Sequence, residues 1–528
     1  MHLIYANERS ENMKLMRKLL GCALAICMLC AASGVQAEEG DGEAQAMYSM
    51  EIVLDETNID KPSLIIKMTT TVYNDSEDQW SEICFRDHMS SLYQWFMYNH
   101  EGEDLSSGIT RAACGDTELS IRTEGVTMPS EPIDDQSAVF VELPDPLLPG
   151  ESVTLNLEYS ADILNDAARC AYSSFVFENE GARTYELAQF YPMLAVYENG
   201  NWNIGPYYTE GECFYSRCAD YEITLLVPEK YEVIASGDET KGETADGMTE
   251  WTISAQDMRD VSIIVSNEYV CKTDEVCGVT VNSWHALNRP DDKNNDHEEQ
   301  GAIQLQAAMD SVAAFTEAYG PLPYDELDVV ESNYMFGGME APGLIRISEL
   351  YSWFIGEDDS EEDRKEYAEK CAGTVAHETA HEWFYAAVGN DQYHEAWLDE
   401  SLAAFSEQVY WRYVGRSEEE VAAVMKPFVE NMPESGNATI NHVYHERLTE
   451  NSHFDYTSAV YQRGAGFIYQ LEQSMGKEAF YAFMQEYYGT YCLGEAHTED
   501  FISTLLPYIE ENDEAKKLVD KYLSPTDR

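Results

Sequence analysis

The hydrophobic pattern of this 528-residue chain changes its period part of the way along the sequence. From about residue 47 to about 270, short apolar alternations separated by turn residues predict strands, for example at 63–68, 152–157 and 221–228. A few more strands follow, among them 327–331, and from Asp363 onward apolar residues recur at spacings of three and four, which predicts helices. The pattern therefore predicts a multidomain α+β protein, with an antiparallel β domain followed by an α-rich domain that contains a small sheet.

These periodicities also give the expected boundaries. The predicted organisation is a targeting segment at 1–37, an acidic linker at 38–46, a β domain at 47–268 and a second domain at 269–528. We expect helices at 363–388, 397–414, 417–432, 459–474, 477–489 and 498–523.

The charge balance excludes two classes of partner. Asp and Glu number 98 against 32 Lys and Arg, which gives a formal net charge of -66. Such a negative potential opposes binding to a nucleic-acid backbone or to an anionic membrane surface. Apolar residues make up 44% of the chain, as in an ordinary globular protein, so a folded core is expected.

Residues 13–37 have the three regions of a secretory signal peptide. A basic stretch that contains Lys14 and Arg17 precedes an apolar run at 19–32, and small residues follow up to Ala37. The apolar run is shorter than the ~20 residues of a membrane span, and no later stretch reaches that length. We therefore expect a secreted or extracytoplasmic protein whose translation starts at Met13, with no integral membrane span. A lipid anchor at Cys30 or Cys22 is the alternative.

Removal of the signal peptide would leave nine of the twelve cysteines in an oxidising compartment. The close pairs Cys213 with Cys218 and Cys271 with Cys277 are candidates for disulfides. Buried free thiols are the alternative, and an odd number leaves at least one cysteine unpaired.

The helix predicted at 363–388 contains two histidines that can bind one metal ion. On an α-helix the side chains at i and i+4 share a face, so His377 and His381 can both direct an imidazole at one ion. Glu378, rotated by ~100° from His377, points beside the ion and can act as a base for an attacking water. The alternative is that the two histidines are core residues of an apolar helix.

A carboxylate on the next helix supports the metal interpretation. Glu400 lies 19 residues after His381, on a helix that can pack antiparallel to the first after the break at Gly389 and Asn390. It would complete a His2Glu set with one coordination position open for water, which is the pattern of a catalytic zinc site. We expect one zinc ion per chain.

Four segments together resemble the gluzincin aminopeptidases of the aminopeptidase N and leukotriene hydrolase type. The segment 377–384 matches HExxHxWF, 397–405 is similar to the WLNEGFA helix, 337–341 is similar to the GAMEN exopeptidase motif and 461–465 to the YxKGA segment. The resemblance runs from about residue 47 to the end of the chain. It implies an N-terminal β saddle and a thermolysin-like catalytic domain, without the large C-terminal helical-repeat domain of many relatives.

The chain departs from these motifs at several positions. Asp399 stands where the family commonly has Asn, Ser401 and Leu402 replace Gly-Phe, and Ala341 replaces the Asn of the exopeptidase motif.

The resemblance also implies roles for individual residues. Glu378 would be the general base, and Tyr461 would stabilise the oxyanion, with the nearby Tyr456 as the alternative for that role. Glu340 would bind the free α-ammonium of the substrate. It lies in a segment that also brings Gly337, Gly338 and Met339 to the substrate, and Gln189 of the β domain is a candidate second amine ligand.

The function expected from this site is zinc-dependent removal of N-terminal residues from peptides with a free N-terminus. A thermolysin-like endopeptidase is the first alternative, and Glu340 argues against it. A catalytically silent binding scaffold is the second, and the presence of Glu378, Glu400 and Tyr461 argues against it. The pattern specifies neither the preferred N-terminal residue nor the oligomeric state.

Overall fold

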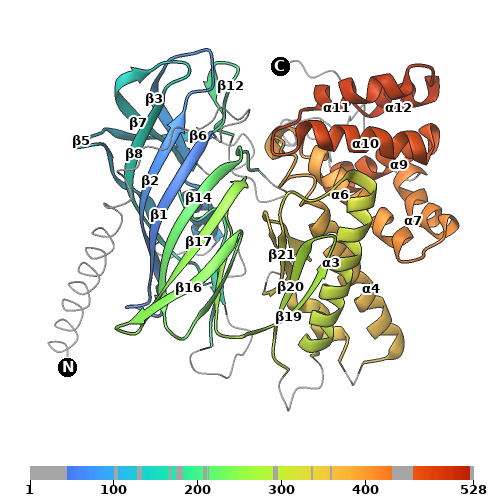
Figure 1. The fold of residues 1–528 in the computed structure, drawn as a ribbon, viewed down its shortest axis with the longest axis horizontal. Helices are drawn as coiled ribbons and strands as arrows, with labels where there is room; N and C mark the ends of the chain where they lie inside the picture. The colour runs from blue at the N-terminus through green and yellow to red at the C-terminus, as the bar shows by residue number, and fades with distance from the viewer. Residues whose placement is uncertain are drawn as a thin grey trace.

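The computed structural model shows a sheet-rich part and a helix-rich part side by side (Figure 1). The residues that it describes are 45–99, 105–127, 134–165, 169–173, 182–205, 211, 213–288, 295–333, 337–356, 359–430, 440 and 456–523. The predicted signal peptide and most of the predicted linker lie outside them. The predicted domain boundary at 268/269 falls between β18 (Ile263–Ser266) and β19 (Tyr269–Val276).

An eight-stranded sheet forms the long wall of the N-terminal part. In sheet order its strands are β16 (Asp238–Ala245), β17 (Met248–Met258), β14 (Ala219–Pro228), β1 (Ala46–Asp55), β2 (Ser63–Tyr73), β8 (Ser152–Asp162), β4 (Ser107–Cys114) and β5 (Thr117–Glu118). Neighbouring strands are antiparallel except for β1 and β14, which run parallel. The prediction of an antiparallel domain therefore needs one correction, because a parallel pair lies at the centre of this sheet.

Smaller sheets and one helix complete the N-terminal part. One four-stranded sheet has the order β15 (Glu232–Ala235), β18, β10 (Thr184–Leu187) and β9 (Cys170–Ser173). A second has the order β11 (Met193–Leu194), β3 (Trp80–Arg86), β7 (Asp134–Leu147) and β6 (Ile121–Thr127), and the hairpin β12 (Tyr197–Glu198) and β13 (Asn201–Trp202) stands apart. The helix α2 (His88–Asn99) was not expected from the strand-like pattern.

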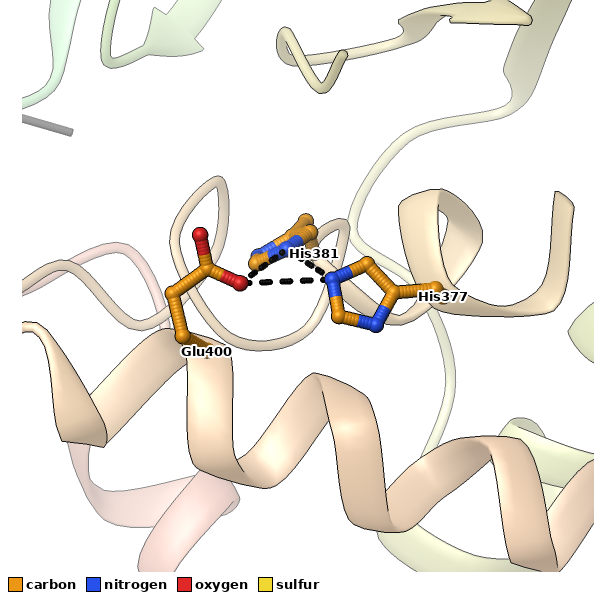
Figure 2. Close-up of side chains that lie close together, drawn as sticks. All are labelled: His377, His381 and Glu400. Carbon is orange, nitrogen blue, oxygen red and sulfur yellow. Dashed lines mark hydrogen bonds and ion pairs between the residues drawn. The ribbon is translucent and has the colours of Figure 1, made fainter. Parts of the chain in front are cut away.

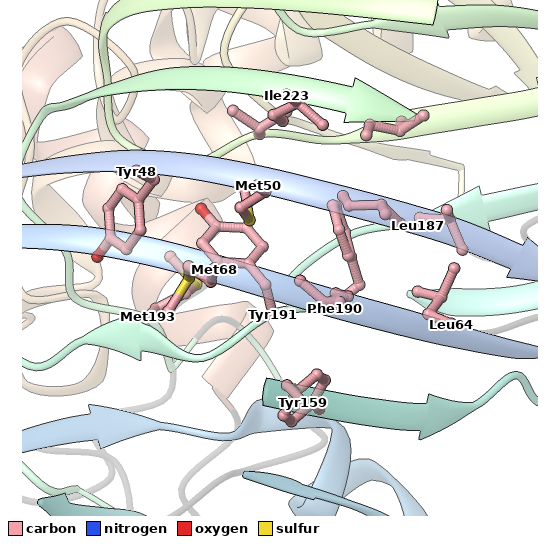
Figure 3. Close-up of a cluster of buried hydrophobic side chains, with 14 of the residues drawn as sticks. Tyr48, Met50, Leu64, Met68, Tyr159, Leu187, Phe190, Tyr191, Met193 and Ile223 are labelled. Atoms are coloured by element: carbon pink, nitrogen blue, oxygen red, sulfur yellow. The ribbon is translucent and has the colours of Figure 1, made fainter. Parts of the chain in front are cut away.

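The core of the N-terminal part lies where the inward side chains of these sheets meet (Figure 3). Along β2, each buried residue is followed by one that is half-buried or exposed. A strand with one covered face requires this alternation. Tyr48 stacks on Tyr221 with ring centroids 4.9 Å apart and meets Tyr191 edge-on at 5.7 Å. The alternation predicted from sequence thus builds a tyrosine-rich core between β1, β14 and the segment after β10.

The second part has a five-stranded sheet covered by helices (Figure 1). Its strand order is β19, β20 (Val279–Ala286), β21 (Glu326–Ser332), β23 (Leu344–Ser348) and β22 (Gly338–Met339). The helical segments are α3 (His297–Tyr319), η1 (Glu349–Phe354), α4 (Glu361–Ala380), α5 (Gln392–Glu395), α6 (Trp397–Tyr413), α7 (Glu418–Glu430), η2 (Thr457–Arg463), α9 (Gly464–Met475), α10 (Lys477–Tyr491), α11 (Thr498–Leu505), η3 (Leu506–Ile509) and α12 (Asp513–Tyr522).

Two helix predictions need correction, and one long helix was not predicted. The helix predicted at 363–388 ends at Ala380, because the chain then tightens into turns that include Tyr385 at a φ of 131°. The helix predicted at 498–523 is broken into α11, η3 and α12, with Pro507 as the second residue of the middle turn and Asn512 capping the last helix. The long helix α3, capped by Asp296, was missed.

The two parts are joined by Arg259, which is 1% exposed and comes from the β domain. Its guanidinium donates to the carbonyl oxygen of Gly494 at 2.6 Å and pairs with Glu495 at 3.0 Å. A Cβ at Gly389 would lie 2.1 Å from this guanidinium, so the glycine break after α4 makes room for it. This contact places the β domain against the loop that follows the histidine helix.

Neither of the predicted disulfides is present. Cys271 lies in β19 and Cys277 in the turn after that strand, so the two are separated by about 20 Å of extended chain. A disulfide requires Cα atoms about 6 Å apart. Cys218 is a buried thiol, and its burial raises its pKa.

None of the helices in the described part of the chain combines the length and the apolar character that a membrane span requires.

Candidate metal centre

Three side chains from α4 and α6 converge on one point (Figure 2). His377 is in the last turn of α4, His381 caps it, and Glu400 lies in the first turn of α6. The distance from Glu400 Oε2 is 3.2 Å to His377 Nε2 and 3.4 Å to His381 Nε2, and the two Nε2 atoms are 3.3 Å apart. The structure thus brings together the three residues predicted as metal ligands.

These distances fit a zinc ion. With bonds of ~2.0–2.1 Å, two ligand atoms of a tetrahedral zinc lie about 3.3 Å apart. The three distances between the ligand atoms agree with this value, so zinc fits without rearrangement. Two imidazoles and one carboxylate also form the donor set of a catalytic rather than a structural site.

The other ring nitrogens of the histidines are held by partners that orient the rings. His377 Nδ1 lies 3.2 Å from Glu407 Oε1, and His381 Nδ1 lies 3.1 Å from the carbonyl oxygen of Phe384. Such partners fix the tautomer that presents Nε2 to a metal. The sequence analysis missed Glu407, although its position two helical turns after Glu400 could have indicated that it shares the same face of α6.

Glu378 is 6% exposed and lies under the strand that carries the exopeptidase-like motif. A Cβ built at Gly338 would lie 2.4 Å from Glu378 Oε1 and 2.5 Å from its Cγ. Glycine at 338 therefore allows the β22 backbone to pass directly over the predicted base.

Glu340 follows β22 and belongs to the same cluster. Its carboxylate, that of Glu378 and a ring nitrogen of His381 all lie within 4.8 Å of one another. Burial raises the pKa of Glu340, and the charge of His381 opposes this rise. Met339, just before it, receives a contact of 3.0 Å from Arg169 Nη1 to its Sδ, so an arginine of the β domain reaches this edge of the site.

Tyr461 lies in η2, a π-helical turn, and its hydroxyl donates to Glu400 Oε1. Its ring lies nearly parallel to that of His377, with the centroids 5.9 Å apart. Tyr456 is 6.0 Å from Tyr461 between ring centroids and contacts the same cleft. Both tyrosines are therefore near the metal set, and the hydroxyl of Tyr461 is the one bonded to a metal ligand.

Gln189 is placed differently from the expected amine ligand. It has a φ of 47°, and its Nε2 donates to Asp260 Oδ2 at 2.9 Å. The same oxygen accepts from Tyr385 at 2.7 Å. Gln189 is not among the described residues that line the cleft, and its role in amine binding stays a prediction.

The cleft over the metal set has a volume of about 1170 Å³. The predicted residues Gly337, Gly338, Met339, Glu340 and Tyr461 line it. The lining residues that the sequence analysis did not single out include Arg169, Tyr351, Glu366, Glu369, Glu407, Gln408, Trp411 and Arg416.

Two of the departures from the family motifs have local explanations. Ser401 Oγ donates to the carbonyl oxygen of Val460 at 2.6 Å, and a Cβ at Gly464 would lie 1.8 Å from that Oγ. Ser401 thus occupies the space that a side chain at Gly464 would need, and its hydrogen bond connects α6 to η2. Asp399 is fully buried, and burial raises its pKa to about 8. Its carboxyl therefore tends toward the neutral form, which is uncharged like the Asn side chain of the family motif.

Comparisons with known proteins agree with this site. Residues 304–522 match the model of the peptidase family M1 domain. Aminopeptidase M1-D of Oryza sativa subsp. japonica is 27% identical over 215 residues, which cover 39% of this chain and 24% of that protein. Aminopeptidase N of Streptomyces lividans is 24% identical over 204 residues, which cover 36% of this chain and 22% of that protein.

The fold is shared over a greater length. The crystal structure of an M1 zinc metallopeptidase from Deinococcus radiodurans has a TM-score of 0.59 to this chain at 17% identity, and the alignment covers 92% of this chain and 96% of the other. The fold is thus that of a zinc metallopeptidase. Residues 304–522 match the domain of peptidase family M1, which supports the resemblance to the gluzincin aminopeptidases. The family implies a catalytic zinc ion, which the three ligands fit.

Proposed function

We propose that this protein is a zinc-dependent aminopeptidase that removes N-terminal residues from peptides. One observation carries the proposal: the carboxylate of Glu340 lies within 4.8 Å of Glu378 and His381. An α-amino nitrogen and the carbonyl carbon of the same residue are only ~2.5 Å apart. A substrate amine paired with Glu340 would therefore bring its first peptide bond to the metal set.

Two protein groups would carry out the proton transfer and charge stabilisation. Zinc, when bound by His377, His381 and Glu400, supplies a Lewis acid that polarises the scissile carbonyl. The carboxylate of Glu378 accepts a proton from the attacking water and passes it to the leaving amine. The hydroxyl of Tyr461 turns from Glu400 to donate to the oxygen on which negative charge develops.

The wider fold supports the same interpretation. In this proposal the large sheet of the β domain is the saddle of the family, and the five-stranded sheet with α3, α4 and α6 is its thermolysin-like domain. Peptides with a free N-terminus are the proposed substrates.

The test uses a panel of aminoacyl chromogenic amides, each with a free and with an N-acetylated amine. We expect the zinc-loaded protein to cleave the free amides much faster, and Glu340→Ala to lose this preference together with most activity. Glu499→Ala, in the first turn of α11, is the control for loss of one carboxylate. Cleavage of internal bonds in N-blocked peptides, unchanged by Glu340→Ala, would favour the endopeptidase, and no cleavage of any substrate would favour the silent scaffold.

We also propose that the protein is exported. The support is the sequence 13–37, with its basic, apolar and small-residue regions. N-terminal sequencing of the protein recovered outside the cytoplasm should start after Ala37. A start at Cys30 or Cys22 with an attached lipid would favour the anchored alternative.

A further inference from the structure

Three carboxylates meet at a second place, far along the chain from the zinc ligands. Glu239 comes from β16 of the large sheet, and Glu326 and Asp328 come from β21 of the five-stranded sheet. One oxygen from each of the three lies within 4.8 Å of the other two. Glu326 and Asp328 are two residues apart on one strand, so their side chains project from the same face of the sheet.

The place where they meet is a junction between the two domains. A Cβ at Gly343, just before β23, would lie 3.8 Å from the carbonyl oxygen of Glu326 and 3.9 Å from the backbone nitrogen of Gly237, which precedes β16. Tyr324 donates to the carbonyl oxygen of Asp257 across the same junction at 3.1 Å. The β domain and the catalytic domain thus contribute carboxylates to one shared cluster.

The hydrogen bonds at the cluster leave oxygen atoms unsatisfied. Asp328 is 1% exposed, and its Oδ1 accepts from the indole of Trp284 at 2.9 Å. Its Oδ2 is buried and has no hydrogen-bond partner among the described residues, and the same holds for Oε2 of Glu239. A buried carboxylate oxygen without a partner is costly, and here its carboxylate belongs to a cluster of three.

The charges around the cluster increase this cost. Burial raises the pKa of Glu239 to about 7, and it also raises the pKa of Glu326 and of Asp328. The charged groups that act on these three are one another and the acidic side chains of Asp238 and Asp325. Only neutral donors oppose the rise: the amide of Asn282 and the indole of Trp284 at Glu326 and Asp328, and the backbone groups of Ala235 and Glu239 at the Glu239 side chain.

We propose that Glu239, Glu326 and Asp328 bind a calcium ion that joins the two domains. Calcium prefers carboxylate oxygens at about 2.4 Å, so two oxygens on opposite sides of the ion are about 4.8 Å apart. The three ligand oxygens fit inside that limit. Waters would complete the six to eight ligands, since Glu239 and Glu326 are only partly buried. The ion supplies the positive charge that the described surroundings of the cluster lack.

The test uses zinc-saturated protein at pH 8, with Ca²⁺ as the probe. We expect one bound Ca²⁺ per chain by calorimetry, and a rise in Tm of about 3 °C or more in 5 mM CaCl2. Tb³⁺ in the same place should luminesce on excitation of tryptophan, because the indole of Trp284 is bonded to a ligand. Asp328→Asn and Glu239→Gln should each weaken binding of Ca²⁺ at least ~10-fold and remove the Tm shift. Glu243→Gln, exposed on the same strand as Glu239, is the matched control and should behave as the wild type.

Two readouts guard against misinterpretation. Zinc content and circular dichroism of each variant separate loss of this site from loss of the active centre or of the fold. Absence of Ca²⁺ uptake by the wild type at 5 mM, or uptake unchanged in both cluster variants, would overturn the proposal. A third result would also overturn the proposal: a Tm that does not change with Ca²⁺ but rises from pH 8 to pH 6 in the wild type and not in Glu239→Gln. That result would mean that protons, and not a metal ion, neutralise the cluster. A stronger response to Mg²⁺ than to Ca²⁺ would overturn the choice of ion.

Discussion

Replacement of Gly338 by alanine tests how closely the substrate-binding strand is packed on the catalytic base. A Cβ at this position would lie 2.4 Å from Oε1, 2.5 Å from Cγ and 2.6 Å from Cδ of Glu378, whereas an ordinary contact begins at 3.4 Å. The deficit is about 1 Å. Because Cγ is as close as the tip of the side chain, rotation of the carboxylate alone cannot relieve it. Either Glu378 or the β22 backbone must shift.

A displacement of ~1 Å in a catalytic group or in a bound substrate can lower the rate ~100-fold. We therefore expect Gly338→Ala to reduce kcat/KM on aminoacyl chromogenic amides about 100-fold. Zinc content, measured by mass spectrometry, should stay at one per chain, because the three atoms nearest the new methyl group all belong to Glu378, which is not a predicted ligand. Gly489→Ala is the matched control, since a Cβ there has no atom within 4 Å. It should leave activity unchanged. Full activity of folded Gly338→Ala would refute the close packing of β22 on Glu378, and loss of zinc in that variant would show that the effect reaches the ligands instead.

Three further predictions concern the residues around the metal. Glu378→Gln should abolish turnover while zinc is retained, because the residue is a base and not a ligand, whereas Glu400→Ala should lose both; full activity of Glu378→Gln would contradict the mechanism. Tyr461→Phe should lower kcat about 100-fold or more with little change in KM, and the same loss in Tyr456→Phe instead would transfer the role to that residue. Glu407→Ala should weaken zinc affinity about 10-fold to 100-fold in a competition titration with a chelator, since it removes the partner of the His377 ring; unchanged affinity would mean that this contact does not orient the ligand.

The part of the site that lies on one helix could be predicted from the sequence, because helix geometry relates residues that are close together in the chain. His377, Glu378 and His381 lie within one turn and a half of α4, so their spacing alone predicted which side chains meet. Glu400 was predicted from one more step, a second helix packed on the first, and the three ligand atoms do meet. Glu340 and Tyr461 were assigned by resemblance to the family motifs, and both line the cleft.

The periodicity also predicted the order of the two domains but not every boundary. Apolar alternation predicted the strands of the β domain, since a strand with one covered face must alternate. The helix α4 ends at Ala380, and the turns that follow contain Tyr385 at positive φ and Gly389 packed under a guanidinium of the β domain, which no periodicity indicates.

Contacts between distant segments were decided only by the tertiary structure. Arg169 reaches Met339 across 170 positions, and Glu239 meets Asp328 from a different sheet. Glu239 and Asp328 alone resemble many other carboxylates in a chain with 98 acids. These residues lie close together because the two domains pack against each other. The energy of that packing is the sum of many weak contacts, so no single sequence motif specifies it. The sequence pattern could therefore identify the zinc ligands, while only the fold could show which carboxylates share the domain junction.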